Sequence, residues 1–270
     1  MLIFGKAIAF IKKDFLIQFS YPLSFLLDLV GAFFSIAVFY FLSRLVGKSV
    51  APYLTSYGGD FFSFLLIGVA FSRYLYVGLN GFARSIRNEQ LAGTLEAMIT
   101  TPTSLSVIIA FSSLWKFVFA SLNILVYLLL GAFLFSVDLS KANILSAIII
   151  VVLTTVAFSS LGIISASFII VFKRGDPINW LVGNLSILLG GVYYPITILP
   201  QWLQKFSYLL PLTYSLRAMR KALLQGYSIR SLSSEIIALL IFSLIMIPLS
   251  LLIFKYAVRK AKIEGSLIHY

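Results

Sequence analysis

The 270-residue chain is 60% hydrophobic and only 11% charged, a composition outside the range of soluble globular domains. We therefore predict an integral membrane protein. The formal net charge of +12 comes without a basic patch on a soluble domain, which argues against nucleic-acid binding. Because the chain contains no cysteine, disulfides, thiol catalysis and metal ligation by cysteine are excluded.

Residues 1–21 carry apolar side chains at helical spacing, while Lys12 and Lys13 point elsewhere. The two lysines and Asp14 interrupt the apolar part and no small-residue cleavage site follows, so a signal peptide is not expected. We predict an interfacial helix in the headgroup region ahead of Pro22. The alternative is a cytoplasmic extension of the first span.

Six apolar stretches are long enough to cross a membrane as helices, the fifth only marginally, since a crossing needs about 20 residues. Strands of a barrel would alternate apolar and polar residues, whereas these stretches are apolar on all sides. We predict an all-α bundle forming a single transmembrane domain over residues 1–270. The predicted spans are Leu23–Val46, Phe61–Phe82, Val107–Phe135, Ile144–Phe172, Ile178–Tyr194 and Ile236–Phe254.

The distribution of lysine and arginine predicts the orientation of these spans. With six spans, 11 basic residues lie on the side of the termini and eight on the other side. Five of those eight fall in the long connection after the fifth span. We therefore predict that both termini are cytoplasmic and that the protein is a multi-pass component of the cell (cytoplasmic) membrane.

The connection between the second and third spans, residues 84–104, is polar and helix-prone. Its sequence is RSIRNEQLAGTLEAMITTPTS, with Glu89 and Glu96 among its charges and leucine or methionine at three- to four-residue spacing. Pro102 ends the helix before the next apolar stretch. We predict a short amphipathic helix across the cytoplasmic membrane face. The alternative is a solvated loop with incidental helix.

An apolar segment after the fifth span, residues 195–226, is divided by prolines into pieces too short to cross the membrane. Non-helical backbone at membrane depth is tolerated only where protein or a water-filled cavity satisfies its polar groups. We predict a re-entrant outer helical hairpin that lines a vestibule. Its two halves are predicted at Gln201–Leu210 and Thr213–Gln225.

These two segments, in this order around six spans, resemble the membrane subunit of ABC-2 type exporters. The first resembles that family's cytoplasmic coupling helix, and residues 191–224 resemble its re-entrant pair before the last span. The resemblance covers essentially the whole chain in length and span order. The matching coupling positions are Glu89, Gly93, Thr94, Leu95, Glu96 and Pro102. The matching re-entrant positions are Pro195, Leu199, Pro200, Pro211 and Leu212.

The resemblance implies an ATP-driven exporter of drug or lipid type. ATP and Mg²⁺ would be bound by a separate ABC ATPase subunit, which the coupling helix contacts. A second permease copy is also implied, and we expect a homodimer in the lipid bilayer. The tryptophan motifs usual around the first span of polysaccharide exporters are missing, which favours a hydrophobic or amphipathic cargo over a long glycan.

The residues themselves argue against a nucleotide site in this chain. A P-loop needs glycine, four residues and then Gly-Lys-Ser/Thr, but residues 47–49 supply only the ending because position 42 is Leu. We expect no catalytic, cofactor or metal site and no enzyme activity.

Ion-coupled transport would need buried carboxylates or histidine, whereas only Asp28 lies within a span and His269 is next to the C-terminus.

Asp28, Arg73 and Lys116 are charged residues within predicted spans, where each costs about 2.5 to 3.5 kcal/mol. From the helix rise, all three fall in the inner half of the membrane. We hypothesise that one cation pairs with Asp28 and that the other faces an inner cavity, where it attracts anionic or phosphate-bearing cargo. The alternative is structural pairing or snorkelling to the headgroups.

Tyr193 and Tyr194 lie with Pro195, Pro200 and Pro211 where the outer interface is expected. We interpret this set as an outer re-entrant gate, although the tyrosines could instead be interfacial anchors.

The alternative functions are an ATP-independent channel or lipid-flipping membrane protein and, from a third class, a structural membrane anchor. A channel would give the 84–104 segment no role.

Overall fold

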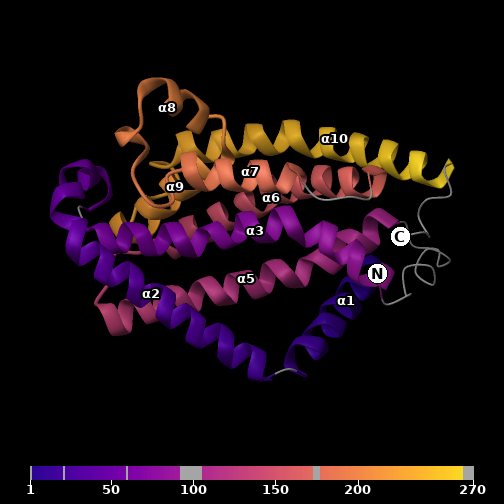
Figure 1. The fold of residues 1–270 in the computed structure, drawn as a ribbon, viewed down its shortest axis with the longest axis horizontal. Helices are drawn as coiled ribbons and strands as arrows, with labels where there is room; N and C mark the ends of the chain where they lie inside the picture. Colours follow the sequence, from indigo (N-terminus) through magenta and orange to yellow (C-terminus); the bar gives the residue numbers. More distant parts are fainter. Residues whose placement is uncertain (1, 21, 59, 92–104, 173–176, 264–270) are drawn as a thin grey trace.

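The computed structural model shows a bundle of helices elongated along one direction (Figure 1). It describes residues 2–20, 22–58, 60–91, 105–172 and 177–263, and no strand occurs in these ranges. The elements are α1 (Leu2–Phe19), α2 (Pro22–Val50), η1 (Ala51–Tyr57), α3 (Phe61–Leu91), α5 (Leu105–Phe135), α6 (Ile144–Phe172), α7 (Pro177–Leu189), η2 (Ile196–Ile198), α8 (Gln201–Ser207), α9 (Pro211–Gln225) and α10 (Ser233–Ile263).

Five helices are long and apolar enough to cross a membrane, which confirms an all-α membrane protein. Their apolar stretches are Leu26–Tyr57, Phe61–Phe82, Leu114–Phe135, Ile144–Phe172 and Ser233–Lys260. The predicted fifth span, Ile178–Tyr194, is not among them. There α7 has only 13 residues, about 20 Å of helix against a hydrocarbon core of about 30 Å. The chain leaves the helix at Gly190, before the Tyr193-Tyr194 pair.

The bundle is built around α3 and α6, which cross at two glycines. Helix α6 packs against α10, α3 and α9, and α3 also packs against α5. A Cβ atom added to Gly162 would overlap the backbone of Gly78, and one added to Gly78 would overlap Phe158. The absence of side chains therefore sets how closely these helices approach. In the apolar stretch of α3, 72% of the residues are buried, whereas the share is 17% in α2 and in α10. These two helices lie at the periphery.

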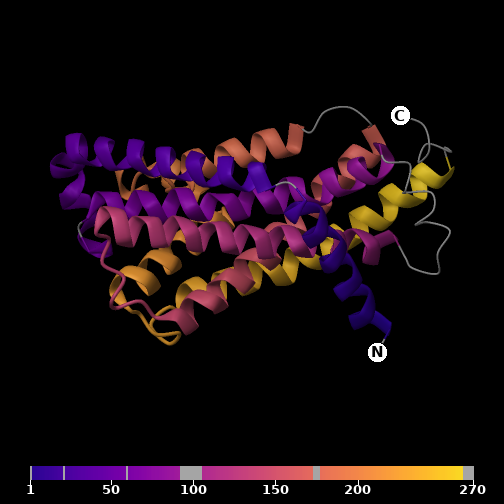
Figure 2. The ribbon, with the colours of Figure 1, turned by 90° about the horizontal axis from the view of Figure 1, so that it is seen from below.

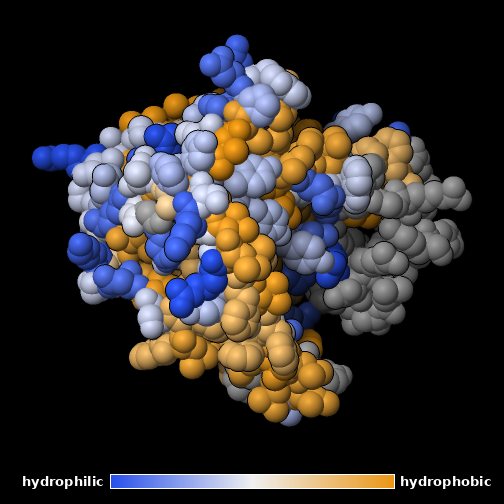
Figure 3. All heavy atoms as spheres, turned by 60° about the vertical axis from the view of Figure 1, so that its left-hand side comes forward, coloured by the Kyte–Doolittle hydropathy of each residue, from blue (hydrophilic) through white to orange (hydrophobic). Residues whose placement is uncertain are grey.

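Polar and apolar surfaces separate along the long axis of the bundle. Helix α1 begins and α10 ends at one end of the molecule, and α8 and α9 lie at the opposite end (Figures 1 and 2). With the α8–α9 end turned forward, hydrophilic residues gather over it and hydrophobic surface adjoins them (Figure 3). Leucine, isoleucine and phenylalanine side chains are exposed along the flanks of α2, α5 and α10, as expected of helices that face lipid.

The N-terminal segment forms a helix of its own that meets α2 at an angle (Figure 1). Helix α1 packs against α5, where the rings of Phe15 and Trp115 meet edge to face at 5.4 Å between centroids. Pro22 starts α2, so the bend falls at the position where proline favours a new helix. A helix therefore occupies Leu2–Phe19 of the predicted range 1–21, and its place in the headgroup region stays a prediction.

Candidate functional site

A polar cavity, open on one side, lies on the flank of the apolar bundle between the α1–α2 elbow and helices α3 and α5. This α3–α5 cavity has a volume of about 530 Å³. Asp28, Arg73 and Lys116, the three charged residues singled out in the sequence, all line it. Its other polar walls are Gln18, Tyr76, Asn80, Arg84 and Asn123.

Arg73 is held by an aromatic partner rather than by a carboxylate. Its Nη2 donates to the hydroxyl of Tyr127 on α5 at 2.7 Å, and its guanidinium carbon lies 4.8 Å from the centroid of that ring. The ion pair predicted with Asp28 is not formed by Arg73, because the nearby tyrosine combines a hydroxyl acceptor with a ring face for cation–π contact. Among the described residues, the exposed carboxylate of Asp28 has no ion-pair partner.

Arg84 repeats the pattern of Arg73, and Lys116 contacts the backbone of α3. The Nζ of Lys116 donates to the backbone carbonyl of Gly81 at 2.8 Å, so it bridges α5 and α3. Arg84 donates to the hydroxyl of Tyr76 and lies 5.2 Å from its ring centroid. Residues 73, 76, 80 and 84 follow each other at three- and four-residue spacing. One stripe of α3 therefore carries the polar wall along the bundle.

A second polar site lies at the α8–α9 end, where Arg220 is buried in the protein. Its side chain is 2% exposed and donates to three backbone carbonyls, those of Phe64 at 3.2 Å, Gly191 at 2.8 Å and Val192 at 3.0 Å. The guanidinium carbon also lies 3.4 Å from the centroid of the Phe64 ring. Burial lowers the pKa of Arg220 to about 9. Because this pKa still lies above neutral pH, the side chain stays charged there. This Arg220 clamp ties α9 to the start of α3 and to the loop after α7.

Gly68 makes room for the Arg220 clamp on the α3 side. A Cβ atom at this position would overlap the carbonyl of Val192 and lie 2.5 Å from the Nη2 of Arg220. Gly191 has a left-handed φ of +80°, which glycine adopts without a steric cost. The two glycines therefore allow the loop after α7 to lie directly on α3.

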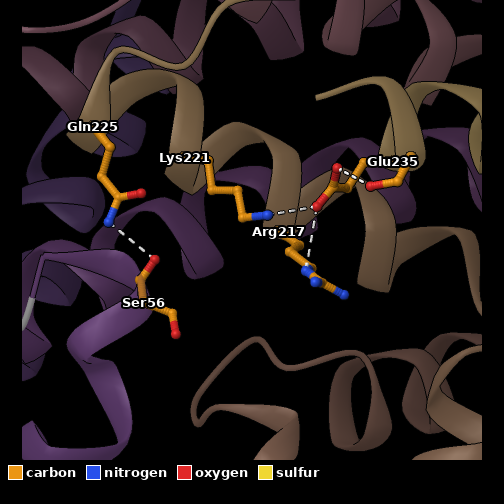
Figure 4. Close-up of polar contacts among 6 residues, drawn as sticks. Ser56, Arg217, Lys221, Gln225 and Glu235 are labelled. Atoms are coloured by element: carbon orange, nitrogen blue, oxygen red, sulfur yellow. Dashed lines mark hydrogen bonds and ion pairs between the residues drawn. The ribbon is translucent and has the colours of Figure 1, made fainter. Parts of the chain in front are cut away.

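The remaining polar residues of α9 bind neighbouring elements (Figure 4). Glu235 of α10 is 1% exposed and accepts from Lys221 at 2.8 Å and from the hydroxyl of Ser234 at 2.7 Å. Arg217 completes an ion pair with it at 3.3 Å. The Nε2 of Gln225 donates to the carbonyl of Ser56 in η1 at 3.0 Å. The polar face of α9 thus joins α10 and η1.

A sequence profile of the family described as ABC-2 type transporter matches residues 6–224, a range that runs from α1 through nearly all of α9. The chain belongs to this family. It is therefore the membrane permease of an ABC transporter, and permeases of this family typically work with an ABC ATPase. A comparison with curated proteins gave no match.

The predicted coupling residues of this permease fall partly outside the described residues. Helix α3 continues without interruption from Phe61 to Leu91, so Glu89 belongs to its last turns. The first eight residues of the 84–104 segment therefore extend the second span instead of starting a separate helix. The other predicted coupling residues, Gly93, Thr94, Leu95, Glu96 and Pro102, lie outside the described residues.

The three prolines of the permease's predicted outer gate all precede or start short helices. Pro195 precedes η2, Pro200 precedes α8, and Pro211 is the first residue of α9. Proline suits these positions because its missing N–H is not needed there. The helices α8 and α9 lie where the two halves of the hairpin were predicted.

The tyrosines of the predicted gate attach the loop after α7 to its neighbours. Tyr193 is 42% exposed and stacks on Phe39 of α2, with 6.0 Å between the ring centroids. The hydroxyl of Tyr194 donates to the carbonyl of Leu188 in α7.

Sequence reasoning missed the Arg220 clamp, although an arginine among the apolar residues of α9 signals a buried charge with a specific partner.

Proposed function

We propose that this permease is the membrane subunit of an ATP-driven exporter that moves a hydrophobic or amphipathic cargo, drug-like or lipid-like, across the cell membrane. The observation that carries the proposal is the family match over residues 6–224, which includes the proposed coupling segment and the α8–α9 module. ATP and Mg²⁺ would be bound by a separate ATPase, and two permease copies would form a homodimer.

Six crossings with both termini in the cytoplasm fit the arrangement of the helices. Successive long helices run in alternating directions, and α7 runs back towards the α8–α9 end before α10 returns (Figure 1). Helix α7 and the loop after it would complete the fifth crossing, with the loop's Gly191 and Val192 carbonyls satisfied by Arg220. In this topology, α8 and α9 form the re-entrant hairpin on the outer side.

Helix α3 offers a mechanical route from the ATPase to the outer gate. It is a continuous helix of 31 residues, about 46 Å long, whose inner end adjoins the coupling segment. Near its outer end, the Phe64 carbonyl is held by Arg220. Closure of the ATPase pair would tilt α3 through Glu89 and Glu96, and the Arg220 clamp would pass this movement to the loop that carries Tyr193 and Tyr194.

The decisive experiment is co-expression of the permease with its ATPase and reconstitution of the purified complex in liposomes. We expect the two subunits to co-purify and ATP hydrolysis to rise when transported cargo is added. A control complex with an ATPase that binds but does not hydrolyse ATP should show no export. Transport by the permease alone, at an equal rate without ATP, would instead support a channel or an ATP-independent lipid-flipping protein.

A further inference from the structure

The α3–α5 cavity adjoins a second, apolar hollow on the same flank of the bundle. This apolar groove has a volume of about 390 Å³. Four residues, Gln18, Trp115, Phe119 and Asn123, line both spaces. A ligand with a polar head and an apolar tail can therefore occupy the two spaces together.

The walls of the α3–α5 cavity carry an excess of positive charge. Among the described lining residues, Arg73, Arg84 and Lys116 are cationic and Asp28 is the one carboxylate, so cations outnumber anions even when the two arginines alone are counted. The groups that orient Arg73 and Arg84 are tyrosine hydroxyls and rings, which leave the positive charge in place. A guanidinium has five donors, so each side chain retains donors for an anion.

The apolar groove opens sideways onto surface that faces lipid. Leu122, Leu125 and Leu129 line it and are 50%, 50% and 43% exposed on α5, one of the five apolar helices long enough to span. A soluble anion would meet hydrocarbon at this opening. A bilayer lipid reaches the groove by lateral movement and brings its headgroup to the cations in the same step.

From this combination, the geometry points to a binding site for one anionic phospholipid of the bilayer. Its anionic headgroup occupies the α3–α5 cavity, which Arg73, Arg84 and Lys116 line, and one acyl chain fills the apolar groove. The bound lipid connects the α1–α2 elbow, which supplies Gln18 and Asp28, to helices α3 and α5. This inference rests on membrane embedding and on the two adjoining spaces, and it concerns a resident lipid whether or not the permease exports lipids.

The test is lipid binding to the purified full-length permease, followed by native mass spectrometry. Phosphatidylglycerol and phosphatidylcholine with identical acyl chains are titrated separately, and we expect the anionic lipid to bind at least tenfold more tightly. The double variant Arg73→Gln/Arg84→Gln should bind phosphatidylglycerol about tenfold or more weakly, because it loses charge-assisted contacts to phosphate. Its binding of phosphatidylcholine should not change.

A matched control removes two cations from a cavity of similar size at the other end of α2. Arg44 and Lys48 line that cavity, which has a volume of about 570 Å³. Arg44→Gln/Lys48→Gln should bind phosphatidylglycerol as the wild type does. Each variant is compared with the wild type by gel filtration and melting temperature. Should the Arg73 variant fail to fold, Arg84→Gln alone, at an exposed position, should still lower affinity several-fold.

The acyl-chain half of the site is tested with Val126→Trp, which fills the apolar groove and keeps all the cations. Long-chain phosphatidylglycerol should bind about tenfold more weakly to this variant. Equal affinity for the two lipids, an equal loss in the Arg44/Lys48 control, or binding of glycerol 3-phosphate as tight as that of the lipid would overturn the proposal.

Two outcomes separate this inference from the proposed function. ATP-driven movement of the bound phosphatidylglycerol across the bilayer would identify it as cargo and overturn its assignment as a resident lipid. Selective phosphatidylglycerol binding by a permease that shows no ATP-driven export would support the lipid site while contradicting the proposed function.

Discussion

Arg220 donates to three carbonyls and stacks on Phe64, and no carboxylate is among its described contacts. Arg73 and Arg84 likewise use tyrosine hydroxyls and rings as partners. Each arrangement satisfies donors of a cation while leaving its positive charge, which an ion pair would offset. At the α8–α9 end the charge is enclosed and holds backbone in place, whereas in the α3–α5 cavity it lines an open space.

Replacing Arg220 tests the clamp at the scale of one residue. Arg220→Met removes the charge and leaves the Gly191 and Val192 carbonyls without this donor, so we expect about 3 kcal/mol of destabilisation. The apparent melting temperature in detergent should fall by about 5 °C or more. Arg217→Met is the matched control, since that side chain is 41% exposed and its ion pair contributes less than about 1 kcal/mol. Equal shifts in the two variants would contradict the assigned role of Arg220.

At the scale of an element, the α3–α6 crossing depends on glycine at both contact positions. Gly162→Val should prevent folding or strongly lower the yield of monodisperse protein, because its Cβ would overlap the backbone of Gly78. Gly31→Val in α2 is the control, as a Cβ there meets nothing within 4 Å. Gel filtration after detergent extraction compares them. A monodisperse Gly162→Val protein at wild-type yield would show that the two helices can separate.

Helix α3 is also the element through which ATPase movement is proposed to reach the outer gate. Glu89→Lys/Glu96→Lys should reduce co-purification of the ATPase, or preserve it while export falls relative to ATP hydrolysis, because both charges proposed to contact the partner are reversed. Asp138→Lys, in an exposed loop before α6, should change neither quantity. Normal assembly and normal export in the double reversal would remove the coupling assignment.

At the scale of the whole molecule, the absence of native cysteine makes the topology directly measurable. Single substitutions Ser56→Cys, Ser140→Cys and Ser228→Cys should react with an impermeant maleimide in intact cells, because six crossings place these exposed positions outside. Ser20→Cys and Ser104→Cys should react only after permeabilisation. Labelling of Ser104→Cys in intact cells would place the coupling segment outside the cell. This result would contradict the proposal that a cytoplasmic ATPase drives transport.

The sequence by itself determined the class of protein and much of its organisation. Long apolar stretches require helices in a membrane wherever they occur, because backbone polar groups in hydrocarbon must pair within their own segment. Pro200 predicted the start of α8 at Gln201, since proline acts on its own turn of helix, whereas α9 begins at Pro211, two residues before the predicted Thr213. The 84–104 and 191–224 segments were sufficient to indicate the family, which the match over residues 6–224 then confirmed.

Only the tertiary structure decided the partners of the buried charges. Asp28 was expected to pair with a cation, but the rotation of α3 and α5 brings Tyr127 to Arg73 instead. Arg220 reaches Phe64, a residue 156 positions earlier in the chain, and spacing within one helix carries no information about such a contact. The marginal fifth stretch likewise ends as a helix at Leu189, because Gly190 and Gly191 let the following loop pack on α3 and the core. Local patterns thus set the helices, and long-range packing set the cavity, the clamp and the length of α7.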